Sequence, residues 1–300
     1  MTVSESSDPA PHSAVIPAKA GTHARLHRAQ RLLAWMPACA GMTLSLAFLA
    51  GSLCAPAIGQ EPTRVIPQSE LHSGKEFVSA ETRAQQDDLD VNPGMLWVEQ
   101  GAKLWNEAAG VEGKSCAACH GEPASMAGTA ARYPAYDAKA QRLLNLEGRI
   151  QQCRSERQKA PALAYESQPL LSLTALVAHQ SRGMPLGVTI DGPARPYFEA
   201  GRTLYYEQQG QLDLSCAQCH EQNWGKRLRA EKISQGHPNG FPAYRLEWQT
   251  LGSLHRRLRA CYQGVRAEPP IGGSRELVNL ELYLAWRAEG LAVETPAVRR

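Results

Sequence analysis

The chain has 300 residues, with 32 Lys and Arg against 29 Asp and Glu, which gives a formal net charge of +3. This length suits two compact domains. The nearly balanced charge excludes the strongly basic composition typical of nucleic-acid-binding proteins, so no nucleic-acid partner is expected.

Residues 1–57 have the pattern of an export leader. Three arginines within residues 25–31 precede an apolar stretch with its core at residues 44–53, and small residues follow it. That core is too short to span a bilayer comfortably, so the sequence favours a removed signal peptide over a membrane anchor. We expect a periplasmic mature protein without membrane attachment, from which Cys39 and Cys54 have been lost.

A Cys-x-x-Cys-His pentapeptide occurs twice, at residues 116–120 and at residues 216–220. This spacing is typical of covalent c-type haem attachment, in which both thiols bond the porphyrin and the His binds the iron. A single copy could be a zinc half-site, but two copies favour two covalently bound haem c groups and a role in moving electrons. The predicted attachment residues are Cys116, Cys119, Cys216 and Cys219, and the predicted axial histidines are His120 and His220.

The similarity between the two halves extends beyond these motifs. Residues 98–120 and 198–220 match at several Gly, Leu, Glu and Ser positions, and their apolar residues have helical spacing. Each half also ends in an apolar segment that predicts a helix, at residues 170–178 and 277–286. We therefore expect a mainly α fold with two tandem class I cytochrome c-like domains related by an internal repeat.

Composition suggests where these domains begin and end. Residues 58–92 are polar with little periodicity, and we expect an extended N-terminal arm that could wrap a neighbour. Residues 183–196 are rich in Pro and Gly and are expected to form a linker. The predicted domains are then 93–182 and 197–290, the latter with the active site, followed by a tail at 291–300.

Each haem iron also needs a second axial ligand or leaves a site open. In ordinary electron-carrying cytochromes c this ligand is Met. Met184 lies at a suitable distance after the first motif, but no Met follows His220. Cys153 and Cys261 are alternatives, because each lies in a matching Leu-x-x-Arg-(Ile/Leu)-x-x-Cys segment after its motif.

Three interpretations of Cys153 and Cys261 compete. They could form a disulfide in an oxidising compartment, although this would join equivalent points of two repeats. They could be buried, unreactive thiols. We favour ligation of each iron by a thiolate, because Arg149 and Arg257 lie one helical turn earlier and a cation there favours the thiolate. A thiolate lowers the haem reduction potential, which indicates chemistry on the sulfur itself.

Basic residues are more concentrated around Cys261 than around Cys153, where acidic residues are interleaved. A basic run is often only a solvated helix face. Beside a sulfur nucleophile, however, a positive pocket would suit a small dianion, and Arg257 is the best candidate for direct contact. The basic residues near Cys261 are His255, Arg256, Arg257, Arg259 and Arg266.

The stretch GFPAYRLEW at residues 240–248 and the segment from Arg257 through Cys261 to Pro269 resemble SoxA, the larger cytochrome subunit of the SoxAX complex of bacterial thiosulfate oxidation. The resemblance covers roughly residues 90–290, and both motifs make the chain similar to the dihaem type. It implies an L-cysteine S-thiosulfotransferase that conjugates thiosulfate to a cysteine of the carrier protein SoxYZ. Two electrons would then leave through haem to SoxX and on to a small cytochrome c.

The resemblance also implies roles for individual residues. Cys261 would be a haem ligand that becomes a persulfide, with His220 as the other axial ligand, and Arg257 would contact thiosulfate. Cys153 and His120 would ligate a first haem that is structural or a relic. His237, Trp248 and Tyr262 could line the site, although packing is the commoner role for such residues.

Two other functions remain open at this point. A plain periplasmic dihaem electron carrier would have Met or His as the sixth ligand. A dihaem peroxidase-like enzyme would have an open site at one iron. The nature of the sixth ligand therefore separates both from the transferase.

Overall fold

The computed structural model describes residues 62–300, so the predicted leader at residues 1–57 lies outside the described residues. The helices are α1 (Ala80–Asp87), α2 (Met95–Asn106), α3 (Cys116–His120), α4 (Leu146–Cys153), α5 (Gln168–His179), α6 (Arg195–Tyr206), α7 (Cys216–His220), α8 (Leu254–Gly264) and α9 (Arg275–Arg287). The strands are β1 (Ala135–Asp137), β2 (Arg142–Leu144), β3 (Arg227–Leu228), β4 (Glu231–Lys232), β5 (Ala243–Arg245), β6 (Thr250–Gly252) and β7 (Ala297–Arg299).

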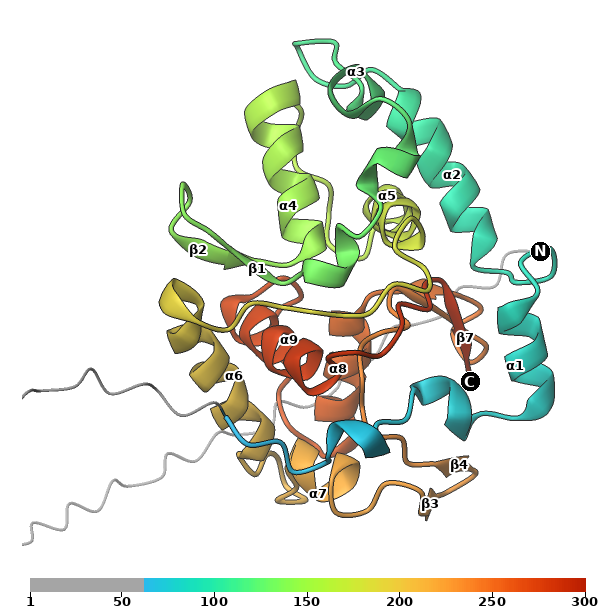
Figure 1. The fold of residues 1–300 in the computed structure, drawn as a ribbon, viewed down its shortest axis with the longest axis vertical. Coiled ribbons are helices and arrows are strands. Elements are labelled where there is room, and N and C mark those ends of the chain that lie inside the picture. The colour runs from blue at the N-terminus through green and yellow to red at the C-terminus, as the bar shows by residue number, and fades with distance from the viewer. Residues whose placement is uncertain (1–61) are drawn as a thin grey trace, which may run out of the picture. The chain divides into compact units, whose positions relative to one another are not determined.

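The two halves repeat one order of elements (Figure 1): a long helix, a short motif helix, a β-hairpin, a helix that carries a further cysteine, and a closing helix. This order runs α2, α3, β1–β2, α4, α5 in the first half and α6, α7, β5–β6, α8, α9 in the second. The helices predicted at residues 170–178 and 277–286 lie within α5 and α9. Strand β7 adds to the second hairpin, parallel to β5.

In each half the first and last helices cross at a glycine. A Cβ atom placed on Gly101 of α2 would lie 2.2 Å from the carbonyl oxygen of Ser172 in α5. A Cβ on Gly201 of α6 would lie 2.0 Å from the carbonyl oxygen of Asn279 in α9. Both positions need glycine because the two backbones touch there, which explains one of the residues matched between the repeats.

The two halves exchange a leucine between their cores. Leu143 of β2, in the first half, is buried in the core of the second half with Phe198 and Leu280. Leu251 of β6, in the second half, is fully buried in the core of the first half with Leu176. Leu143 and Leu251 hold matching positions in the repeat, so the exchange is reciprocal and each half completes the core of the other.

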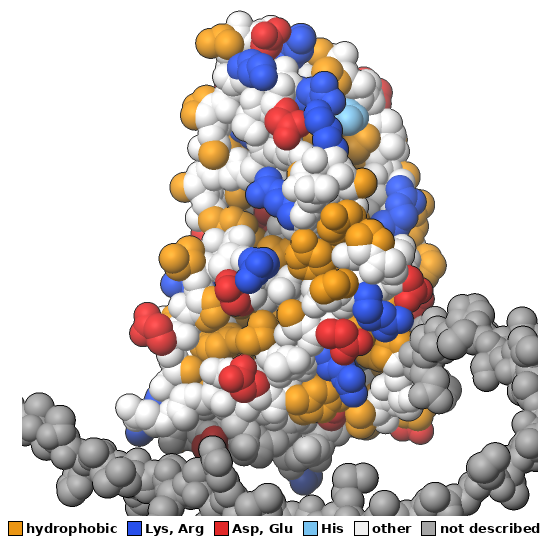
Figure 2. Space-filling model, turned by 90° about the vertical axis from the view of Figure 1, so that its left-hand side faces the viewer, with side chains coloured by type: hydrophobic (Ala, Val, Ile, Leu, Met, Phe, Trp, Pro, Cys, Tyr) orange, Lys and Arg blue, Asp and Glu red, His pale blue; other side chains and the backbone are white. Residues whose placement is uncertain are grey.

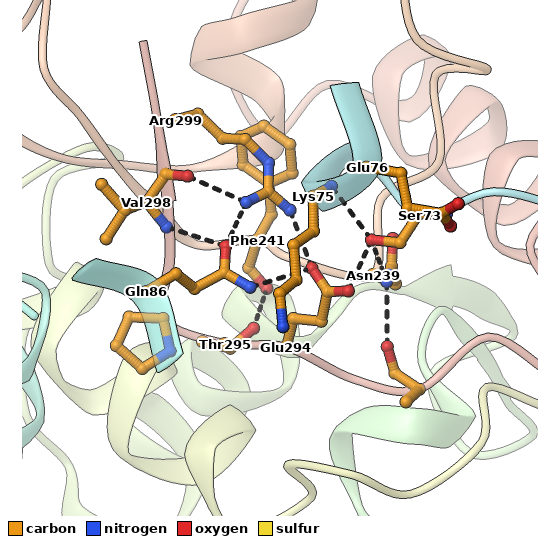
Figure 3. Close-up of polar contacts among 12 residues, drawn as sticks. Ser73, Lys75, Glu76, Gln86, Asn239, Phe241, Glu294, Thr295, Val298 and Arg299 are labelled. Carbon is orange, nitrogen blue, oxygen red and sulfur yellow. Dashed lines mark hydrogen bonds and ion pairs between the residues drawn. The ribbon is translucent and has the colours of Figure 1, made fainter. Parts of the chain in front are cut away.

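The beginning of the described chain packs against the chain's own C-terminal end (Figure 3). Gln86 accepts a hydrogen bond from the backbone N–H of Val298 at 3.2 Å and another from Arg299, and it donates to Glu294 at 3.3 Å. Glu294 also accepts from Arg299 at 2.8 Å and from the hydroxyl of Ser73. These polar groups therefore satisfy one another away from water.

The polar segment before residue 93 is not wholly extended as the sequence suggested, since α1 forms within it. Ser79 caps this helix by accepting a hydrogen bond from the backbone N–H of Thr82 at 3.3 Å. Similarly, the predicted linker at residues 183–196 ends in helix, because α6 begins at Arg195 with Pro196 in its first turn. The Ser79 cap favours helix at α1, and Pro196 in the first turn favours helix at α6.

The described surface carries both signs of charge. The face shown in Figure 2 has apolar patches across its middle, with basic and acidic side chains interspersed and neither sign dominant. None of the helices within residues 62–300 is long and apolar enough to cross a bilayer.

We expect Gly201→Ala to lower the free energy of unfolding by about 2–3 kcal/mol, because the added methyl group would overlap the backbone of α9. Gly264→Ala is the matched control: Gly264 is an exposed helical glycine, and a Cβ there would meet nothing within 4 Å. Removing that glycine should stabilise the protein slightly. Chemical denaturation would measure both changes, and equal effects would contradict the proposed helix contact.

Candidate functional site

Each Cys-x-x-Cys-His motif forms a short helix that is capped by the preceding serine. Ser215 accepts a hydrogen bond from the backbone N–H of Gln218 at 3.2 Å, and the Gln218 side chain accepts from the N–H of Ser215 at 2.7 Å. Ser115 caps the first motif by accepting from the N–H of Ala118 at 3.0 Å. These caps fix both thiols and the histidine of each motif on one short helix.

The imidazole of His220 is held in one orientation. Its Nδ1 lies 2.7 Å from the carbonyl oxygen of Ser234, so Nδ1–H donates there and Nε2 keeps a free lone pair. The ring packs over Gly236, where a Cβ atom would lie 2.8 Å from Cγ of His220. Burial lowers the pKa of His220 to about 4, so the ring is neutral near pH 7. A neutral, oriented imidazole is the form that ligates iron.

The first motif is more open. His120 and Cys119 are exposed, and the His120 ring forms no hydrogen bond with any residue in the described part of the chain. Its nearest aromatic neighbour is Trp105, with ring centroids 5.8 Å apart, and the indole N–H of Trp105 donates to the carbonyl of Gly121 at 2.8 Å. The second motif is therefore the more buried of the two, and its histidine ring is the one held by a hydrogen bond.

Each additional cysteine lies beside its own motif. Burial raises the pKa of Cys216 to about 12, and nearby Cys261 contributes to this shift. Burial likewise raises the pKa of Cys116, with a further contribution from Cys153. Cys153 and Cys261 are both free thiols, so the disulfide interpretation is wrong for this structure. Met184 is 39% exposed, and its sulfur lies beside Gly128.

These residues fit covalently bound haem at each motif. The two motif thiols can form the thioethers, the histidine supplies one axial nitrogen, and a cysteine of α4 or α8 is available as a second axial ligand. The fit is closest at the second motif, because the Ser234 carbonyl sets the tautomer of His220 and Gly236 leaves room for its ring.

The arginines that precede the two additional cysteines differ in their partners. Arg149 is paired with Asp137, with 2.6 Å between Nη2 and Oδ2. Burial raises the pKa of Cys153, and Arg149 lowers it by a smaller amount. Arg149 therefore favours the Cys153 thiolate, as expected from the sequence, but burial has the larger effect on this pKa. Arg257 forms no side-chain hydrogen bond or ion pair with any other residue between 62 and 300.

Sequence reasoning singled out Arg257 but missed Arg245, which lies near both Arg257 and Cys261. Burial lowers the pKa of Arg245, and Arg257 lowers it further, whereas Glu231, Glu247 and, by a smaller amount, Cys261 raise it. The signal was available in the repeat, because YPAYD at residues 133–137 matches FPAYR at residues 241–245. This comparison shows a charge reversal at one matched position.

The three residues suggested as possible lining side chains are packed. His237 is buried, with its Nε2 3.0 Å from Oε1 of Gln235, and burial lowers its pKa to about 3. Tyr262 is buried, and burial raises its pKa to about 12. Trp248 stacks with two arginines, Arg245 at 5.0 Å and Arg256 at 4.3 Å from the ring centroid.

Comparison with known proteins assigns this arrangement to a family. L-cysteine S-thiosulfotransferase subunit SoxA of Pseudaminobacter salicylatoxidans is 46% identical over 236 residues, covering 78% of this chain and 82% of that protein. The subunits of the same name from Rhodovulum sulfidophilum and Paracoccus pantotrophus are 45% and 43% identical and cover 77% and 76% of this chain, with 80% and 79% of their own lengths matched. The chain belongs to the SoxA family.

Two further comparisons support the fold and the cofactor of this SoxA-family chain. The crystal structure of SoxXA from P. pantotrophus matches with a TM-score of 0.75 and 42% identity, over 77% of this chain and 87% of that one. A family model described as SoxA/TsdA, cytochrome c domain, matches residues 100–186. The fold is therefore mainly helical and cytochrome c-like, and the cofactor is covalently bound haem c.

In this SoxA-family chain the helices that carry Cys153 and Cys261 begin in one buried polar network. Asn145, which caps α4, donates to the hydroxyl of Tyr165 at 3.0 Å and to Glu281 at 3.1 Å. His255, in the first turn of α8, lies 3.0 Å from the Tyr165 hydroxyl and 2.9 Å from Glu281. The two cysteine-bearing helices are thus tied together at their N-terminal ends.

Glu147, which matches His255 in the repeat, is buried beside this network and lines a cavity of about 60 Å³. Burial raises the pKa of Glu147 to about 8, and the carboxylate of Glu281 adds to this effect. Burial works to lower the pKa of His255, but Glu281 and Glu147 together raise it. Glu147 therefore holds a proton at neutral pH in the folded protein.

We expect Glu147→Gln to reduce the pH dependence of stability. Glu147 has a folded pKa near 8 and an unfolded value near 4.5, so its contribution is present at low pH and is lost as pH rises between these values. The free energy of unfolding should fall between pH 5 and pH 8 by on the order of 3 kcal/mol more in the parent protein than in the variant.

Denaturant unfolding at several pH values would measure this difference. Exposed Glu99→Gln is the control and should leave the pH profile unchanged. Because Glu147 also helps to raise the pKa of His255, the substitution lessens the pH dependence contributed by His255 in the same direction. Parallel profiles for the parent and Glu147→Gln would contradict a protonated, buried Glu147.

We expect Gly236→Ala to disturb the His220 ring and to lower the haem-to-protein ratio. Gly225→Ala is the matched control, because Gly225 also has positive φ (+81° against +74°) but a Cβ there would meet nothing within 4 Å. Backbone strain is then common to both variants. The additional cost in Gly236→Ala should be about 1–3 kcal/mol of unfolding free energy. Equal haem content in the two variants would argue against the packing role of Gly236.

Proposed function

We propose that this chain is the dihaem SoxA subunit of an L-cysteine S-thiosulfotransferase that acts in thiosulfate oxidation. Relatives with this name match most of the chain at 43–46% identity. The observation that carries the proposal is the position of Cys261. Its thiol lies near Cys216 and Cys219 of the more buried motif and near Arg245, in a region where the Arg257 side chain has no hydrogen-bond or ion-pair partner among residues 62–300.

The proposed reaction joins thiosulfate to a cysteine thiol of the carrier protein SoxYZ. A bond forms between the outer sulfur of thiosulfate and the cysteine sulfur, the thiol loses its proton, and two electrons leave. Haem c, when bound, supplies the redox chemistry that accepts electrons one at a time. The electrons then pass to SoxX and from there to a small cytochrome c.

The residues have different roles in this proposal. Cys261 is the catalytic residue and an axial ligand, and Arg257 binds thiosulfate through charge-assisted hydrogen bonds. His220 is held by Ser234 in the tautomer that presents Nε2 to the iron. Attachment of two haems uses Cys116, Cys119, Cys216 and Cys219, and the first haem, with His120 and Cys153 as axial ligands, has a structural role.

The proposed organisation follows the repeat. Two tandem cytochrome c-like domains, at residues 93–182 and 197–290, follow an N-terminal arm at residues 58–92. The match to SoxXA supports a heterodimer with a SoxX subunit. A signal peptide within residues 1–57 would direct the protein to the periplasm, where haem is attached to such motifs.

We expect Cys261→Ser to abolish thiosulfate-dependent reduction of cytochrome c by the complex with SoxX, with at least a ~100-fold loss of rate. Haem should stay covalently attached, because attachment uses Cys216 and Cys219. Gln263→Ser, an exposed change on the same helix, controls for effects on α8 itself. Stopped-flow or steady-state absorbance of cytochrome c measures the rate. Normal turnover by Cys261→Ser would remove Cys261 from the mechanism.

A further inference from the structure

Arg245 is a buried cation without a hydrogen-bonded partner. The residue is 6% exposed, and its Nε is buried with no acceptor. Its ion pair in the described chain is a long one to exposed Glu247, with 3.7 Å between Nη2 and Oε2, beyond hydrogen-bonding distance, and Glu231 also lies near enough to raise its pKa. A guanidinium carries five N–H donors, and burying a donor without an acceptor is costly. Among residues 62–300, the protein therefore supplies no hydrogen-bonded acceptor for this buried guanidinium.

The first half shows how the equivalent region is satisfied within the protein. Arg149, the counterpart of Arg257, donates to the hydroxyl of Tyr133 at 2.9 Å and to Gln152 at 2.6 Å. Its third partner is Asp137, at 2.6 Å. All acceptors around this arginine are side chains of the same half.

Every one of these acceptors is replaced in the second half. At the matched positions Tyr133 becomes Phe241, Gln152 becomes Ala260, and Asp137 becomes Arg245. The first two changes remove an acceptor, and the third exchanges a carboxylate for a guanidinium. Arg257 is thereby left without a hydrogen-bonded protein partner among residues 62–300.

These arginines lie near the candidate catalytic sulfur. Arg245 and Arg256, the residue before Arg257 in α8, stack on the same Trp248 ring. Burial lowers the pKa of Arg245 and nearby Arg257 lowers it further, whereas Glu231, Glu247 and Cys261 raise it. The Arg245 guanidinium is held in place by the ring of Trp248, at 5.0 Å. Trp248 is itself fixed because Gly252 makes room for it, since a Cβ there would lie 2.4 Å from the indole.

We propose that Arg245 and Arg257 form a two-guanidinium oxyanion site beside Cys261, with Arg245 as its buried, pre-oriented member. The chemistry it recognises is an anion with several oxygen acceptors: thiosulfate, or a carboxylate of the haem when bound. The identity of the anion as thiosulfate rests on the proposed function, whereas the site itself rests on two arginines that lack hydrogen-bonded acceptors among residues 62–300.

The test uses the haem-loaded complex with SoxX and three variants. Arg245→Met removes the charge but keeps the length, and Arg245→Asp restores the carboxylate that pairs with the equivalent arginine in the first half. Arg256→Met is the matched control, because Arg256 stacks on the same Trp248 ring at 4.3 Å. Thermal unfolding checks that each variant is folded, and the Arg–Asp pair is already accommodated in the first half.

Three quantities are measured: KM for thiosulfate, the inhibition constant of sulfate as an unreactive dianion, and the haem midpoint potential. Loss of one charge-assisted contact should raise KM and the sulfate constant ~10- to 100-fold in Arg245→Met. Arg245→Asp should raise them at least as much, because the new carboxylate pairs with Arg257. Arg256→Met should change both by less than ~3-fold.

The outcomes separate the two sources of the anion. Weaker thiosulfate and sulfate binding at an unchanged potential identifies a substrate site. A shifted potential with unchanged KM identifies a haem carboxylate as the anion. If Arg245→Met and Arg256→Met behave alike in all three measurements, Arg245 serves only to stack on Trp248 and the inference is overturned. If the parent complex shows no thiosulfate-dependent turnover but binds sulfate through Arg245, the proposed function fails and the anion site stands.

Discussion

A guanidinium withdrawn from water needs an anion, and the two halves of this chain meet that need differently. Arg149 is paired with Asp137 within the first half, so this arginine has an acceptor of its own. In the second half, Arg245 stands where the first half has Asp137, and Arg257 stands where it has Arg149. Neither Arg245 nor Arg257 has a hydrogen-bonded acceptor among residues 62–300. The same arrangement of elements thus surrounds the two arginines with different side-chain partners.

The first half also contributes to the packing of the second. Leu143 of the first half is buried in the core of the second half, and Leu251 of the second half is buried in the core of the first. The first half also supplies Asn145 and Glu147 to the polar network from which both cysteine-bearing helices begin. Removing the first half would therefore expose core residues of the second half and unpair buried polar groups near the start of α8.

The sequence predicts features that depend on local pattern. The motif spacing and helical periodicity were sufficient for the haem-binding segments and for α5 and α9. The roles of Arg245 and Gly236 depend on tertiary neighbours, which local spacing does not reveal. The exchange of Leu143 and Leu251 is hidden for the same reason, because an apolar residue in a strand predicts burial but not which core receives it.

Two positive charges beside Cys261 would also favour turnover in the proposed reaction. Thiosulfate is a dianion, whereas the S-thiosulfonate group formed on the carrier cysteine bears one negative charge. Coulomb attraction to a fixed pair of guanidinium groups scales with the charge of the bound group, so it falls by about half when the sulfur–sulfur bond forms. The charge that captures the substrate thus holds the product less tightly, and the carrier can leave once the electrons have been removed.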